Sequence, residues 1–153
     1  MKPQKQRFKH DPENGIYGDC HRTAIATVLG IDRDDVPHFG DGDPPAEEFF
    51  RREAEFLKRF NLRTVVVPFG DKLQNVLDFA QHANGDTPYL LGGTSKTGVH
   101  HTVVGRGNAI AHDPSTTDAG IVAPCKDGYY WLSFFVVDDL AAHVARHHQR
   151  GAA

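Results

Sequence analysis

The order of hydrophobic periodicities along the chain is the feature that most limits its fold. Apolar residues recur at helical spacing in three segments of the first half of the chain, at 20–29, 46–60 and 71–82, with one β-branched strand at 63–68. From Thr87 onward short strand-like runs take over: PYLLGG, VHHTVVGRG, NAIAHDP and the segment 128–137. Helices followed by consecutive strands predict an α+β domain in which helices pack on an antiparallel sheet.

Chain length favours one domain that covers residues 1–153. Residues 1–13 are polar and contain little to bury, which predicts an extended arm. At the other end, Asp138 or Asp139 is suited to cap a last helix that ends near His148, and we expect residues 149–153 to form a disordered tail.

Charge and composition exclude several classes of protein. The formal net charge is -3 with 39% hydrophobic residues, so we expect no nucleic-acid partner. No apolar run is long enough to span a membrane and no export signal is evident, which favours the cytoplasm of the producing or host cell. The two cysteines, Cys20 and Cys125, are too few for a disulfide scaffold, and we expect at least one free thiol.

Cys20 falls at the start of the first predicted helix. Asp19 is suited to cap the segment 20–29, and Gly30 to end it. Unpaired N–H groups and the helix dipole at such a position favour the thiolate, which is the nucleophilic form of a cysteine. The competing interpretation is a small buried side chain at a helix start.

A histidine and an aspartate flank a predicted hairpin later in the chain. If residues 106–108 form the turn, 102–104 run alongside 109–111, and His101 and Asp113 become near neighbours. A carboxylate that accepts a hydrogen bond from an imidazole fixes its tautomer and stabilises the imidazolium. Cys20, His101 and Asp113 therefore form a candidate triad.

These segments resemble the papain-like cysteine peptidase superfamily, in particular its small bacterial and phage members. The matching segments are GDCHRTAIATVLGI, HTVVG and AHDPS, in Cys, His, Asp order, and the resemblance covers residues from about 14 to 137. It implies a papain-like fold, Cys20 as nucleophile, His101 as base and Asp113 as its orienting acid. It also implies a peptide or protein substrate and no cofactor.

The resemblance places a polar amide about six residues before the nucleophile, where it completes an oxyanion hole. Asn14 occupies that distance, although the family residue is usually glutamine. The alternative is that Asn14 and Gly15 form a turn.

Two further histidines are candidates for the rim of the site. His100 competes with His101 for the role of base, because adjacent strand residues point to opposite faces. The resemblance aligns His101, which leaves His100 as a solvent-facing or substrate-rim residue. His21 follows the nucleophile and is a second rim candidate.

Other functions remain open from the sequence. The same thioester chemistry serves glutamine deamidation and transglutamination, and a papain-like fold can also act as an inactive binding protein, for example one encoded by a phage. A metal-dependent hydrolase could use the histidines around Asp113, which are His100, His101 and His112. The pair His143 and His147 is better explained as part of a solvated helix.

Overall fold

The computed structural model describes residues 1–151, over which the chain forms an α+β fold as predicted. The α-helices are α1 (Cys20–Leu29), α2 (Ala46–Lys58), α3 (Leu73–Asn84) and α4 (Leu140–Gly151), and two short 3-10 helices are η1 (Pro12–Asn14) and η2 (Arg33–Asp35). The strands are β1 (Leu62–Phe69), β2 (Tyr89–Thr94), β3 (His100–Arg106), β4 (Ala109–His112) and β5 (Tyr130–Val137). Residues 152 and 153, the end of the predicted tail, lie outside the described residues.

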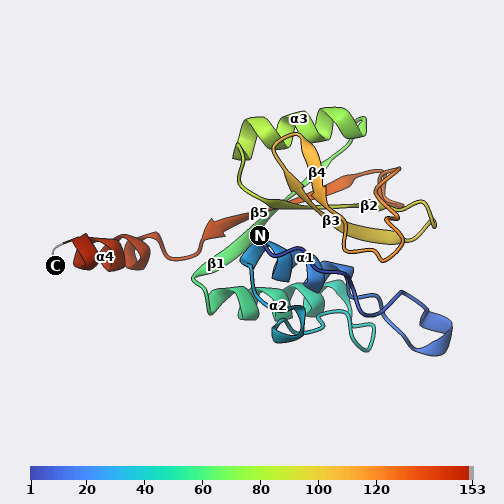
Figure 1. The fold of residues 1–153 in the computed structure, drawn as a ribbon, viewed down its shortest axis with the longest axis horizontal. Coiled ribbons are helices and arrows are strands. Elements are labelled where there is room, and N and C mark those ends of the chain that lie inside the picture. The colour runs from blue at the N-terminus through green and yellow to red at the C-terminus, as the bar shows by residue number, and fades with distance from the viewer. Residues whose placement is uncertain (152–153) are drawn as a thin grey trace.

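The five strands form one antiparallel sheet in the order β1-β5-β2-β3-β4. Helices α1 and α2 cover one face of the sheet and α3 covers the other (Figure 1). The last strand in sequence, β5, therefore lies between β1 and β2 and joins the two halves of the chain.

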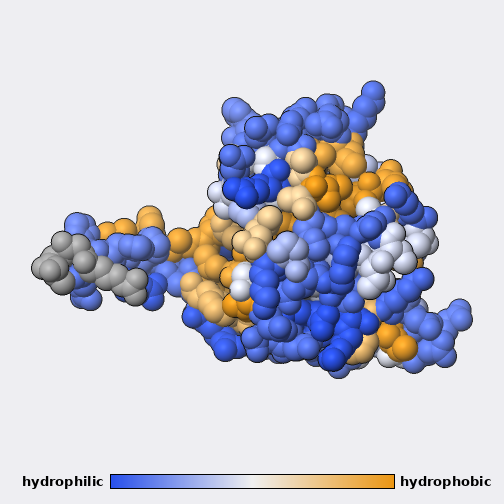
Figure 2. Space-filling view, in the orientation of Figure 1, coloured by the Kyte–Doolittle hydropathy of each residue, from blue (hydrophilic) through white to orange (hydrophobic). Residues whose placement is uncertain are grey.

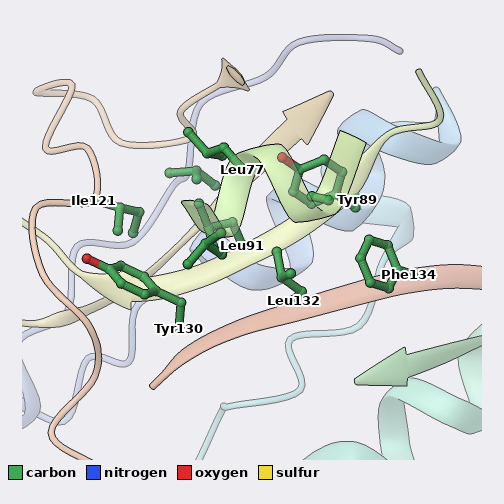
Figure 3. Packing of buried hydrophobic residues seen from close by; sticks show 10 residues of the cluster. Leu77, Tyr89, Leu91, Ile121, Tyr130, Leu132 and Phe134 are labelled. Carbon is green, nitrogen blue, oxygen red and sulfur yellow. The ribbon is translucent and has the colours of Figure 1, made fainter. Parts of the chain in front are cut away.

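Two apolar clusters, one on each face, hold these layers together. Helix α3 packs with alternate residues of β2, β3 and β5, and Figure 3 shows this cluster around Tyr89, Leu91 and Leu132. The intervening strand residues, such as Leu90 and Val104, pack against α1 and α2. Because neighbouring strand residues face opposite clusters, both faces of the central strands are buried and the register is strongly specified.

The hairpin between β3 and β4 differs from the prediction. Its turn contains two residues, Gly107 and Asn108, so Arg106 pairs with Ala109. Gly107 supplies the positive φ of 58° that such a tight turn needs. An irregularity between Val104 and Gly105 then shifts the register, and β4 pairs only with the second half of β3. The edge of β3 beside His101 is therefore free of a paired strand within the described chain.

The two ends of the chain behave differently. Residues 1–10 contain no helix or strand, and η1 begins at Pro12, inside the segment 1–13 predicted as an arm. Asp139 caps α4 by accepting a 2.9 Å hydrogen bond from the N–H of Ala142. Helix α4 continues to Gly151 and so includes the first residues of the segment 149–153, which was predicted as a tail. Figure 2 shows α4 standing clear of the body of the molecule.

No helix among the described residues combines the length and the apolar character needed to cross a membrane.

Candidate active site

Cys20 is the first residue of α1, but Asp19 does not cap this helix with its side chain. The Asp19 carboxylate is buried and turns toward the N-terminal arm, where Oδ1 accepts hydrogen bonds from the N–H groups of Arg7 at 2.9 Å and Phe8 at 2.8 Å. Its Oδ2 lies 3.1 Å from Arg22. The predicted cap is corrected, and the N–H groups of the first turn beside Cys20 stay free of side-chain capping.

His101 and Asp113 are brought together at the edge of the sheet. Nε2 of His101 lies 2.6 Å from Oδ1 of Asp113. The carboxylate also accepts the N–H of Ser115 at 2.8 Å and the N–H of Gly120 at 2.7 Å. Burial alone raises the pKa of Asp113, but these hydrogen bonds and the charge of His101 outweigh it and lower the pKa. Asp113 is thus an ionised acceptor held in a fixed orientation.

Cys20 is the other group that favours the charged form of His101. Burial opposes the charged form of the imidazole, yet a hydrogen bond and charge attraction to Cys20, together with those to Asp113, raise the pKa of His101. Because Nε2 is used by Asp113, Nδ1 is the ring nitrogen left for the thiol. The side chain is only 5% exposed, so water screens this pair little.

Asn14 lies elsewhere. Its Nδ2 donates a 2.8 Å hydrogen bond to Asp11, its side chain is exposed, and Gly15 follows with a positive φ of 68°. The structure therefore assigns Asn14 to a turn and not to an oxyanion hole, which corrects the prediction.

A different amide, Gln6, lies in the arm where the arm contacts the residue after Asp113. Its backbone N–H donates to the carbonyl of Pro114, the residue after Asp113, at 2.8 Å. Its Nε2 donates one hydrogen bond, to Phe8 at 2.9 Å, and its buried Oε1 has no partner among the described residues. Gln6 could not be singled out from the sequence, because it stands fourteen residues before Cys20 in a polar segment without a recognisable motif.

His21 is not a rim residue. Its Nε2 lies 2.6 Å from Oε2 of the buried Glu53 on α2, and its Nδ1 lies 3.3 Å from Oγ1 of Thr102 on β3. The rings of Phe39 and Phe49 pack edge-on against the imidazole. This corrects the prediction, because these contacts hold the side chain between α1, α2 and β3.

His100 lies on the opposite face of β3 from His101. Its Nδ1 is 3.3 Å from Sγ of Cys125, and the group is exposed. Burial and the negative charge of Asp127 raise the pKa of Cys125, which favours the neutral thiol there. The rim position predicted for His100 is compatible with this exposure, and Cys125 has a setting unlike that of Cys20. The two cysteines are free thiols.

The histidines considered as metal ligands are engaged separately. His112 contacts the carbonyl of Gln4 at 2.6 Å, while His100 and His101 point to different partners. Within the part of the chain that the structure describes, no group of three or more His, Cys, Asp or Glu side chains is placed to hold a metal ion.

No protein-family model, curated protein or solved structure matches this chain.

Proposed function

We propose that the protein is a cysteine hydrolase that cleaves an amide, peptide or isopeptide bond through a thioester on Cys20. The observation that carries this proposal is the 2.6 Å contact of His101 with Asp113, on an imidazole whose pKa Cys20, the first residue of α1, helps to raise. The resemblance to papain-like peptidases in the segments around these three residues supports the same chemistry.

The first half of the reaction forms the thioester. His101 accepts the thiol proton, and Sγ of Cys20 attacks the carbonyl carbon of the substrate to give a tetrahedral oxyanion. Collapse of this intermediate breaks the C–N bond while His101 returns the proton to the leaving amine. Asp113 keeps the imidazole oriented and stabilises its charged form throughout.

The second half releases the product. Water loses a proton to His101 and attacks the thioester, which yields the carboxylic acid and restores the thiol. If an amine attacks in place of water, the same intermediate gives transglutamination, and a glutamine side chain as substrate gives deamidation. The acyl acceptor and the leaving group thus decide among these reactions on one triad.

Two N–H donors support a role in stabilising the oxyanion. The backbone N–H of Cys20 is in the uncapped first turn of α1. Gln6 has a second Nε2–H that no described residue uses, and its backbone is bound beside Asp113. A preorganised donor of this kind contributes about 10²- to 10³-fold to kcat.

Site-resolved alkylation tests this function. We expect iodoacetamide at about pH 6 to label Cys20 much faster than Cys125, because only a thiolate reacts and Cys125 stays protonated. Peptide mass spectrometry resolves the two sites. His101→Ala should slow the labelling of Cys20, while Cys125→Ser should leave it unchanged. Equal and slow labelling of both cysteines in the wild-type protein would contradict the proposal and favour an inactive binding protein.

A further inference from the structure

A second chain of side-chain contacts, from Thr102 through His21 to Glu53, lies next to the triad. Thr102 Oγ1 contacts Nδ1 of His21, Nε2 of His21 contacts Glu53, and Oγ1 of Thr64 donates to the other carboxylate oxygen of Glu53 at 2.8 Å. This chain connects β3, α1, α2 and β1, and α1 and α2 lie on the same face of the sheet (Figure 1).

Two residues of this chain of contacts directly follow two residues of the triad in the sequence. His21 directly follows Cys20, and Thr102 directly follows His101. The contact of His21 with Thr102 therefore ties the residue after the nucleophile to the residue after the base. Any movement of the first turn of α1 relative to β3 must break this contact.

Glu53 is the fixed end of this chain. Its residue is 2% exposed, and both carboxylate oxygens have a partner. Burial alone raises the pKa of Glu53, but the charge of His21 and the hydrogen bonds from His21 and Thr64 lower it. His21 is the side chain in contact with this buried carboxylate, at 2.6 Å.

We propose that Glu53 is a positioning residue that holds Cys20 and His101 at reacting distance through His21. The inference rests on the proposed function of Cys20 and His101. Thr102 is 3% exposed, which keeps substrate away from its hydroxyl, so this second chain is not another catalytic triad.

Every group that faces His21 can affect the pH dependence by which this proposal is tested. Glu53 approaches it from α2, Thr102 from β3, and the apolar rings of Phe39 and Phe49 cover it. The charge of His21 also acts on His100. Replacing the carboxylate by the neutral amide of Gln therefore removes the negative charge beside His21 and leaves an amide and Oγ1 of Thr102 as its polar neighbours.

The matched experiment compares Glu53→Gln with Glu55→Gln. Both substitutions remove a carboxylate from α2, but Glu55 is exposed and pairs only with Arg51. We expect Glu53→Gln to slow alkylation of Cys20 at about pH 6 by about tenfold. A tenfold change corresponds to a shift of about one unit in the pH at which the alkylation rate reaches half its maximum. At about pH 9 even an ordinary thiol is largely thiolate, so the rate should stay within about twofold of wild type. Glu55→Gln should match wild type at both values.

The pH dependence separates positioning from a general loss of stability. A residue with only a structural role changes the melting temperature without moving the alkylation profile. Wild-type alkylation at both pH values in folded Glu53→Gln would overturn the inference. If wild-type Cys20 itself fails to react at about pH 6, the proposed function fails first.

A second variant keeps the test valid if Glu53→Gln does not fold. Thr102→Val is nearly isosteric, suits a strand and removes the hydroxyl that contacts His21. We expect a smaller shift in the same direction. An unchanged profile in folded Thr102→Val would then overturn the inference.

Discussion

The backbone N–H of Gln6 donates a 2.8 Å hydrogen bond to the carbonyl of Pro114, the residue that follows Asp113. Lys5 adds contacts to the carbonyls of Asp113 at 3.0 Å and Ser115 at 2.7 Å. Two residues further along, the arm is bound to Asp19, the neighbour of Cys20. The N-terminal arm thus connects the two sides of the site, and Gln6 lies between them along the arm.

The first prediction concerns the Gln6 side chain. Gln6→Ala removes the free Nε2–H but keeps the backbone bond to Pro114, so we expect acylation of Cys20 by p-nitrophenyl acetate to slow by about 10²- to 10³-fold. Alkylation by iodoacetamide forms no oxyanion and should keep its rate. Gln74→Ala on the exposed surface of α3 is the matched control. Equal losses in both reactions would show that Gln6 acts only on the structure.

The second prediction concerns the buried carboxylate of Asp19. Asp19→Asn removes the buried negative charge that pairs with Arg22, and it weakens the hydrogen bonds that Asp19 accepts from the N-terminal arm. We therefore expect the free energy of unfolding to fall by about 3–5 kcal/mol. Urea unfolding measures the loss, and trypsin should cleave after Arg7 faster in folded protein. Asp138→Asn breaks the long 3.8 Å surface pair with Arg63 and should cost less than about 1 kcal/mol. Similar losses in the two variants would contradict this role for Asp19.

The third prediction concerns acid stability and Asp113. Its pKa is lower in the folded protein, so its contribution is present above the unfolded value of about 3.9 and is lost as pH falls through the folded pKa. Asp113→Asn removes this contribution. Wild type should therefore exceed the variant in unfolding free energy most at about pH 5. The gap should shrink toward about pH 2 as Asp113 is protonated, and also as pH rises through the raised pKa of His101, because Asp113 stabilises the imidazolium. A gap that is independent of pH would exclude the ionised carboxylate as its source.

The fourth prediction concerns packing beneath β3. A Cβ added to Gly105 would lie 2.2 Å from the ring of Tyr89, whose hydroxyl is fixed by a bond to the carbonyl of Gly107. We expect Gly105→Ala to lower the free energy of unfolding by about 1–3 kcal/mol, since the ring is buried and cannot move away. A Cβ added to Gly70 would lie 3.3 Å from the exposed ring of Tyr129 and 4.0 Å from the carbonyl of Gly128, so Gly70→Ala should be nearly neutral in the same thermal melts. An unchanged free energy of unfolding in Gly105→Ala would contradict this, because it would mean that the Tyr89 ring can shift to accommodate the added Cβ.

Local patterns predict much of this fold. The first helix begins and ends as its apolar spacing and Gly30 indicate, and the strands fall where alternating or β-branched runs stand. The contact between His101 and Asp113 was also predictable, although the assumed turn was too long. Their side chains meet in either register because both residues lie at the open end of the hairpin.

Contacts between segments that are far apart in the sequence could not be predicted from it. Gln6 gains its position only when the arm docks on Pro114, and Glu53 pairs with His21 only when α2 packs on α1. In the sequence, Glu53 is one of several charged residues on an amphipathic helix, and its burial depends on how that helix is rotated. From the sequence, Asp19 is expected to accept hydrogen bonds from the nearby N–H groups of the helix. In the structure it accepts them from the N–H groups of Arg7 and Phe8 in the arm.

The most direct test of the account is the acyl-enzyme itself. Reaction with excess p-nitrophenyl acetate should release a burst of p-nitrophenolate of about one equivalent per chain, and mass spectrometry of the quenched protein should find the acetyl group on Cys20. Cys125→Ser should keep the burst, and Cys20→Ser should abolish it. Acetyl groups on Cys125 to the same extent as on Cys20, or a burst that survives in Cys20→Ser, would contradict the assignment of Cys20 as the nucleophile.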